Sequence, residues 1–176
     1  MNKFPARIRK LPRDTHGHPI PWFAWRDAEG QVHITTIDQQ KRRWSYQFGI
    51  CQICGQRLGA YKAFALGPNQ VETRTTTEGP AHPGCVRYAL RVCPFLSNPN
   101  WKRHDGTKSF NPGKFALWIT RDYEIGVLPD GAIAIIVGEP VSVRWWTAGH
   151  QLEKSKFRVS VLDGPNPSGN ANERTA

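Results

Sequence analysis

The amino-acid sequence predicts an α+β fold with antiparallel strands and a strand-rich C-terminal half. Three features indicate this fold. Runs of β-branched and aromatic residues follow one another from residue 115 onward, the stretch PGCVRYALRVCP has the apolar periodicity of a helix, and two closely spaced pairs of Cys or His residues lie before and at the start of that helix. A chain of 176 residues is expected to form one domain, with at most a small appendage.

The first part of the chain predicts an arm, a hairpin and a short helix. Residues 1–20 are basic, contain three prolines and show no periodicity, which favours an irregular basic arm. The stretch WFAWRDAEGQVHITTI predicts a β-hairpin, because two β-rich runs flank a turn in which Gly30 can adopt a positive φ. The stretch DQQKRRWSYQF predicts a short helix that Asp38 caps.

The middle of the chain predicts a strand pair followed by the clearest helix. AYKAFALG and VETRTTT read as the second pair of strands. In PGCVRYALRVCP, Pro83 suits the first turn of a helix and Pro94 ends it. One apolar stripe runs along this helix through Val86, Ala89, Leu90 and Cys93. A long polar, basic loop is expected over residues 97–114.

The C-terminal half predicts a series of strands and then a tail. FALWITRDYEIGVLP turns at Asp130 and Gly131 into AIAIIVG, and VSVRWWT and KFRVSVL predict two further strands. Because strand side chains alternate, one tryptophan of the RWW triplet is expected to face the core. Residues 163–176 are too polar to pack and are expected to be a disordered tail.

Two pairs of residues have the spacing of zinc ligands. Cys51 and Cys54 form a Cys-x2-Cys before Gly55, and His82 and Cys85 form a His-x2-Cys at the start of the predicted helix. A structural zinc ion takes four such ligands in a tetrahedron. Knuckle, hairpin and helix in this order predict a treble-clef-like zinc site. We therefore expect one zinc-stabilised domain over 21–162, with a zinc core over 49–93 and a β part over 115–162.

Other interpretations of these cysteines remain open. A redox Cys-x2-Cys would use only the first pair and would leave His82 and Cys85 unexplained. Cys93 completes the apolar stripe and is expected in the core, although it would be the substitute ligand if His82 pointed away. A catalytic zinc would keep a coordination position for water, which four protein ligands do not leave. Residues 55–81 also lack the histidine that treble-clef nucleases carry in this hairpin.

Composition and charge restrict the class of protein. The chain has no run of 18 apolar residues and no apolar segment near its basic start, so we expect neither a membrane span nor a secretory signal but a cytoplasmic protein. The formal net charge is +10, with the excess in the first two thirds of the chain. Such asymmetry suggests a nucleic acid or an acidic protein surface as the partner. The alternative is a charge that serves only solubility.

Basic residues are interleaved with aromatic ones in two places, which suggests contacts to phosphates and stacked bases. The candidate binding residues are Lys41, Arg42, Arg43, Arg87, Arg91, Trp101, Lys102 and Arg103. Trp44 and Phe48 are four residues apart on the predicted helix, and the plainer interpretation is that they form its buried side.

Several stretches resemble a family of small, uncharacterised proteins from bacteria and their phages. The resemblance covers roughly residues 20–147 and rests on WFAWRD, CQICGQRLGAYKAFALGP, EGPAHPGCVRYALRVCPFL, LWITRDYEIGVLPDG and GEPVSVRWW. It implies a bacterial or phage setting and makes Cys51, Cys54, His82 and Cys85 the expected metal ligands. Cys93 belongs to the same signature and stays an alternative ligand. The resemblance carries no assigned activity.

The sequence thus predicts a non-enzymatic, zinc-stabilised basic protein of bacterial or phage origin that binds nucleic acid. The alternative is an interaction protein that docks on, or inhibits, a host nucleic-acid enzyme or defence component. A third hypothesis is an enzyme with an unrecognised site. The dependence of binding on salt separates the first two, because only phosphate contacts release many counterions.

Overall fold

The computed structural model describes residues 4–101, 111–129 and 131–152. The predicted strand KFRVSVL, the predicted tail over 163–176 and the candidate binding residues Lys102 and Arg103 lie outside these ranges. The architecture is α+β with antiparallel sheets and a strand-rich C-terminal half, as the sequence predicts.

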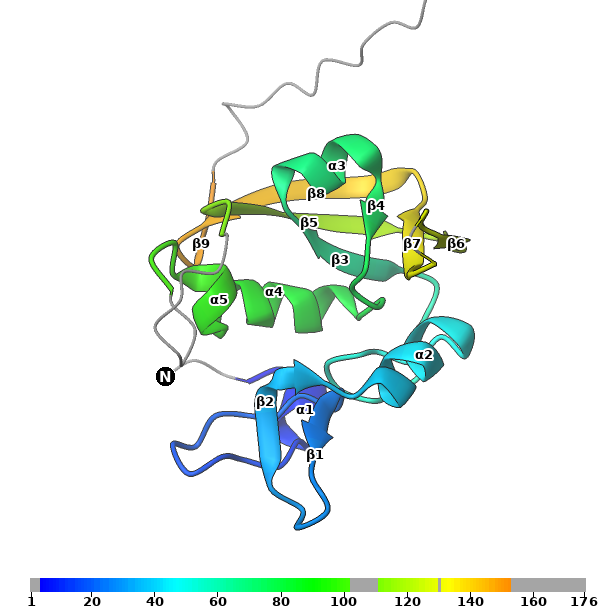
Figure 1. The fold of residues 1–176 in the computed structure, drawn as a ribbon. Coiled ribbons are helices and arrows are strands. Elements are labelled where there is room, and N and C mark those ends of the chain that lie inside the picture. Colours follow the sequence, from blue (N-terminus) through cyan, green and yellow to red (C-terminus); the bar gives the residue numbers. More distant parts are fainter. Residues whose placement is uncertain (1–3, 102–110, 130, 153–176) are drawn as a thin grey trace, which may run out of the picture.

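The N-terminal part contains two helices and one hairpin (Figure 1). Its elements are α1 (Ala6–Arg9), β1 (Ala24–Arg26), β2 (Val32–Ile37) and α2 (Gln39–Gln47). The predicted hairpin and helix are confirmed: β1 pairs antiparallel with β2, Gly30 has a φ of 82°, and the Asp38 side chain accepts the Lys41 N–H at the start of α2. The expectation of an irregular arm is wrong for α1, because Ile8 of this helix is fully buried in the core.

The middle part differs from the prediction at one element. It contains β3 (Lys62–Leu66), α3 (Pro68–Thr73), β4 (Thr75–Thr76), α4 (Pro83–Val92) and α5 (Pro94–Ser97). Helix α4 is confirmed. The second strand of the expected pair is instead α3, which begins with Pro68 and whose Gln70 side chain accepts the Gly67 N–H at 2.8 Å. The remaining short strand, β4, pairs with a distant strand and not with β3.

The described residues of the C-terminal part form a series of strands, as the sequence predicts, but the predicted run FALWITRDYEIGVLP divides after Thr120 into two strands that belong to different sheets. The strands of this part are β5 (Lys114–Thr120), β6 (Tyr123–Val127), β7 (Ile133–Val137), β8 (Pro140–Thr147) and β9 (His150–Gln151). The strands form a four-stranded sheet in the order β3-β5-β8-β9 and a three-stranded sheet in the order β4-β7-β6. All neighbouring strands within them are antiparallel. Trp146 is buried and Trp145 is half-buried, in agreement with the expected alternation.

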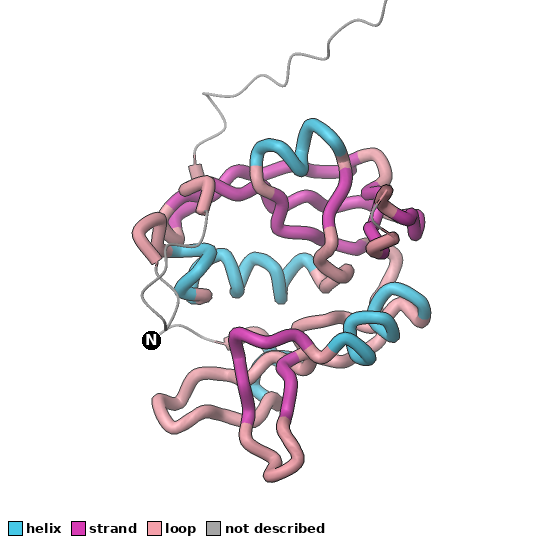
Figure 2. Tube along the Cα trace, viewed as in Figure 1, coloured by secondary structure: helices cyan, strands magenta, loops and turns pink. Residues whose placement is uncertain are grey.

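The four-stranded sheet is covered on both faces. Helix α4 runs along one face, with the N-terminal elements beyond it, and α3 and the three-stranded sheet lie toward the other (Figures 1 and 2). One core cluster joins Leu90 of α4 to Leu117 of β5 and includes Ile8, Cys51, Cys54 and Cys85. A second cluster joins Phe64 of β3 to Ile135 of β7. The three cysteines of the first cluster therefore lie where α4, β3 and the N-terminal part meet.

Candidate metal centre and basic surface

Four side chains converge in the first core cluster. The ligand atoms of Cys51, Cys54, His82 and Cys85 all lie within 4.8 Å of one another, and all four residues are buried. In the described part of the chain, no other group of three or more Cys, His, Asp or Glu residues gathers in this way. The four residues predicted from their spacing are thus brought together, and the cluster is consistent with a bound metal ion.

The first pair is held by a tight turn before β3. The Cys51 carbonyl accepts the Gly55 N–H at 2.8 Å, and the Cys51 N–H donates to the Gln56 carbonyl at 2.8 Å. Gly55 has a φ of 71°, and a Cβ at this position would lie 2.6 Å from the Trp22 ring. Glycine is therefore required both for the backbone conformation and for the close approach of Trp22.

The second pair is held by the first turn of α4. His82 is the N-cap residue and its carbonyl accepts the Cys85 N–H at 2.9 Å, so both side chains project from one end of the helix. Ala81 exchanges two backbone hydrogen bonds with Ala63 of β3, at 2.8 and 3.0 Å. This bridge fixes the start of α4 against β3 and replaces the longer strand pair that the sequence suggests.

Hydrogen bonds orient the histidine ring and the first thiol. The Nε2 of His82 lies 3.0 Å from the Arg57 carbonyl, to which it can donate a proton. The Nδ1 then faces the sulfurs, 3.4 Å from Cys54 Sγ and 3.9 Å from Cys85 Sγ. The backbone N–H groups of Cys54 and His82 each donate to Cys51 Sγ at 3.5 Å. Outer contacts of this kind are typical of metal-binding histidines and thiolates.

The three thiols strongly affect one another's protonation. Hydrogen bonds from Cys51 and then Cys85 hold the pKa of Cys54 far below its ordinary value. Hydrogen bonds with Cys51 and then with Cys54 raise the pKa of Cys85, and the bond to Cys54 raises that of Cys51. Without a cation, the Cys54 thiolate therefore accepts hydrogen bonds from the neutral thiols of Cys51 and Cys85. A metal ion that binds all three as thiolates would release those protons.

Cys93 lies outside the cluster. It is the C-cap residue of α4 and is half-buried, and its side chain does not belong to the group of four. The expectation that Cys93 belongs to the core is thus met only partly. The fourth member of the cluster is His82, so Cys93 is not needed as a substitute ligand.

Cys93→Ala is expected to keep the full metal content and to lower the free energy of unfolding by about 1 kcal/mol or less, the scale of one partly buried small group. Elemental analysis and chemical denaturation measure both quantities. A metal content near zero would instead make Cys93 a ligand.

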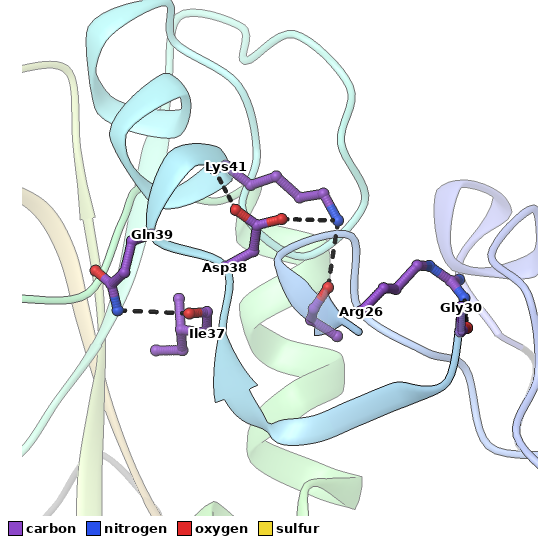
Figure 3. A network of polar contacts seen from close by, with 7 residues as sticks. Arg26, Gly30, Ile37, Asp38, Gln39 and Lys41 are labelled. Carbon is purple, nitrogen blue, oxygen red and sulfur yellow. Dashed lines mark hydrogen bonds and ion pairs between the residues drawn. The ribbon is translucent and has the colours of Figure 1, made fainter. Parts of the chain in front are cut away.

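The cluster of Lys41, Arg42 and Arg43 on α2 is only partly available for binding. The Lys41 ammonium contacts the Asp38 carboxylate at 3.4 Å and the Ala24 carbonyl at 3.2 Å (Figure 3). The Arg42 guanidinium donates to the Ile133 carbonyl at 3.4 Å and is half-buried. Arg43 is exposed and makes no hydrogen bond or ion pair with any described residue. Lys41 and Arg42 therefore tie α2 to its surroundings.

The aromatic residues of α2 and of the segment after α5 differ from their expected roles. Trp44 is 41% exposed and Phe48 is 58% exposed, so the interpretation of a buried side is wrong. The buried residues of α2 are Ser45 and Tyr46. Trp101 is half-buried and packs edge-on against Phe95, with ring centroids 5.6 Å apart. This packing limits its use as a stacking platform.

A basic surface emerges where the N-terminal segment packs on α4. The Phe4 and Tyr88 rings lie 5.6 Å apart, and the Arg13 guanidinium lies 4.2 Å from the Phe4 ring centroid. Arg87 and Arg91 on α4 are exposed, and so are Arg7, Arg9, Lys10 and Arg13. The sequence does not predict that the arm packs on this helix. The isolated apolar residues Phe4 and Ile8 were the signal that the arm packs against the core.

Compared with models of protein families, with curated proteins and with solved structures, the chain gives no match. The resemblance described from sequence motifs therefore stays a prediction. No helix among the described residues has the length and apolar character needed to cross a bilayer.

Proposed function

We propose that this chain is a non-enzymatic protein stabilised by one structural zinc ion, and that it binds nucleic acid through a basic surface. The observation that carries the proposal is the position of the buried Cys51, Cys54, His82 and Cys85 cluster at the start of α4, a helix on which Arg87 and Arg91 are exposed. The zinc site would hold α4 and the packed N-terminal segment in place. Those two elements would present the positive charge.

The donor set and its spacing favour zinc. Three thiolates and one imidazole are a common structural zinc set, and the preferred arrangement is a tetrahedron. With bonds of about 2.3 Å to sulfur and about 2.0 Å to nitrogen, a tetrahedral ion holds its S and N ligands about 3.5 Å apart. The separations of 3.4 and 3.9 Å from His82 Nδ1 to the Sγ atoms of Cys54 and Cys85 are close to this value.

The closed ligand set favours a structural role. Four buried protein ligands leave no coordination position for a reacting water, whereas a catalytic zinc ion keeps one open. The chemistry that the ion would supply is cross-linking of the turn around Cys51 to the first turn of α4. The residues around it orient the ligands and exclude water.

The charge on the proposed surface favours a polyanion. Residues 82–97, which contain α4 and α5, include no Asp or Glu. In the N-terminal segment, the one acid is Asp14, whose carboxylate is engaged by the backbone N–H groups of His16 and His18 at 2.9 and 2.8 Å. These hydrogen bonds lower the pKa of Asp14 and turn its charge toward its own loop. We define the basic surface as Arg7, Arg9, Lys10, Arg13, Arg87 and Arg91.

Replacing Arg7 and Arg9 together by Ala is expected to weaken nucleic-acid binding similarly for all sequences. Each lost phosphate contact should reduce the slope of log K against log salt by roughly 0.7–0.9. Fluorescence anisotropy with labelled 20-nucleotide DNA and RNA, single-stranded and duplex, measures the loss of affinity. Repeating the titration over a range of salt concentrations measures the slope.

The matched control replaces Arg121 and Arg144 by Ala, which removes the same amount of charge. Both arginines are exposed; Arg144 lies on β8 and Arg121 directly follows β5. An equal loss in this control would contradict the proposed location. No binding by the unaltered protein at about 50 mM salt to any DNA or RNA would refute nucleic-acid binding and would point to the alternative, a protein partner with an acidic surface.

A further inference from the structure

Strand β6 lies at the open edge of the three-stranded sheet. The sheet order is β4-β7-β6, and among the described residues β7 is the only strand that pairs with β6. Figure 1 shows β6 at the outer side of this sheet, away from α4. A strand in this position presents a row of backbone N–H and C=O groups that have no partner in the sheet.

The hydrogen-bond pattern shows which groups point outward. The Asp122 carbonyl accepts the Gly138 N–H, and the Leu128 N–H donates to the Ala132 carbonyl. In an antiparallel pair, bonded positions alternate along each strand. Residues 124 and 126 therefore also bond to β7, and the backbone groups of Tyr123, Ile125 and Val127 face the outer edge.

The side chains at this edge are apolar and unusually exposed. Val127 is 73% exposed and Ile125 is 50% exposed. Natural edge strands are usually protected by Lys, by Pro or by a bulge. Strand β6 has the sequence YEIGV and pairs with β7 without a register shift, so it lacks all three, and its one charged side chain is Glu124. Residues 122–143 contain no Lys or Arg at all.

We propose that β6 pairs with β6 of a second copy of this chain and forms a symmetric dimer. A two-fold axis at Ile125 places Ile125 opposite its own equivalent and Tyr123 opposite Val127. The three outward residues of each strand then meet in three pairs, and each pair exchanges two backbone hydrogen bonds. The two sheets become one continuous antiparallel sheet.

The charges of the strand fit this register. Glu124 is the one charged residue of β6, and the two-fold axis places it opposite Gly126 of the second copy. The two Glu124 carboxylates therefore do not face each other. If the two-fold axis lay at Glu124 instead, one residue away, the two carboxylates would lie directly opposite each other. The exposed side chains of Ile125 and Val127 meet apolar partners from both copies. The edge of β6 is thus complementary to itself: its backbone groups can pair, its apolar side chains meet, and its carboxylates stay apart.

A five-residue strand buries little area, so the dimer is expected to be weak and to depend on concentration. Sedimentation velocity of the full chain from about 5 to 500 µM should show conversion from the mass of one chain to the mass of two. A monomer over the whole range would overturn the proposal.

Ile125→Pro is the sharpest variant. The Ile125 N–H faces outward, so proline removes a donor from the proposed interface without removing a bond to β7. The expected result is a monomer at 500 µM with an unchanged far-ultraviolet circular dichroism spectrum. Val127→Lys is the second variant, because it leaves the backbone unaltered and replaces the apolar side chain opposite Tyr123 of the second copy by a charged one.

Val141→Lys is the matched control, since Val141 is also exposed, at 54%, but lies on β8. This control should dimerise as the unaltered chain does. Dimerisation of folded Val127→Lys with unchanged strength would overturn the proposal, and so would equal weakening by Val141→Lys. These readouts need no nucleic acid, so the dimer and the proposed function can fail separately.

Discussion

Cys51→Ser is expected to lose the proposed zinc ion and, with it, the folded structure of residues 49–93. Apparent binding free energies of structural zinc sites are on the order of 10 kcal/mol, and binding energy of this kind is folding energy. The whole stability of a small domain is about 5–15 kcal/mol, so loss of the ion removes most of it. Elemental analysis should find one zinc per unaltered chain and almost none in the variant, and thermal unfolding monitored by circular dichroism should show the lost transition.

The matched control is Cys93→Ser, which makes the same chemical change outside the cluster. It should keep zinc and a melting temperature close to that of the unaltered chain. Unchanged zinc content and melting temperature in Cys51→Ser would show that the four residues do not hold a structural metal ion. Addition of a strong chelator to the unaltered protein should reproduce the effect of Cys51→Ser.

The expected effect is large because the cluster is part of the first core cluster and not an attachment to it. Cys51 is fully buried and Cys85 is 1% exposed, and they pack with Ile8, Val86 and Leu90. Three buried thiols that carry one negative charge between them destabilise an apolar core, because burying an uncompensated charge costs free energy. A bound cation would neutralise them and connect the N-terminal part to α4.

The parts of the molecule that the sequence predicts are those in which short-range chemistry decides the outcome. The spacing of Cys51 and Cys54 fits one turn, and the spacing of His82 and Cys85 fits the start of one helix. The apolar stripe of α4 and the glycine turn of the first hairpin are likewise local. In each case, few residues separate the groups that interact, so the pattern itself contains the geometry.

Helix α3 shows where local patterns compete. The β-branched residues of VETRTTT favour a strand, but the start signals that precede them are stronger. Pro68 occupies the first turn, the Gln70 side chain accepts the Gly67 N–H, and Arg74 ends the helix with a φ of 52°. The β-rich run then contributes only Thr75 and Thr76 to a strand.

Long-range packing is the other reason for the differences. Nothing in the sequence near Lys62–Leu66 says that β3 pairs with β5, which begins about fifty residues later. The burial of Ile8 and the exposure of Trp44 depend on which surfaces meet across the fold. The surroundings of Arg42 also depend on long-range packing, because its guanidinium lies near Glu78. Burial raises the pKa of Glu78, and the positive charge of Arg42 offsets part of that increase.

Phe64→Ala is expected to lower the free energy of unfolding by about 3–5 kcal/mol, the range for truncating a buried phenylalanine. Phe64 is 1% exposed and lies in the second core cluster with Leu66, Trp118 and Ile135. It also contacts the Tyr123 ring edge-on, with ring centroids 6.0 Å apart. The cavity would therefore open between the two sheets, on the face of β3 opposite the metal centre. Urea denaturation of the zinc-loaded protein measures the change.

Tyr61→Ala provides the control, because Tyr61 immediately precedes β3 but is 41% exposed. Its loss should cost far less than the loss of Phe64. Zinc content should stay at one per chain in both variants, since neither residue belongs to the first core cluster, which contains the cysteines. A loss of zinc in folded Phe64→Ala would mean that the second core cluster and the metal centre are not independent. A cost below about 1 kcal/mol would contradict the packing of the two sheets against each other through Phe64, because no buried aromatic side chain is removed so cheaply.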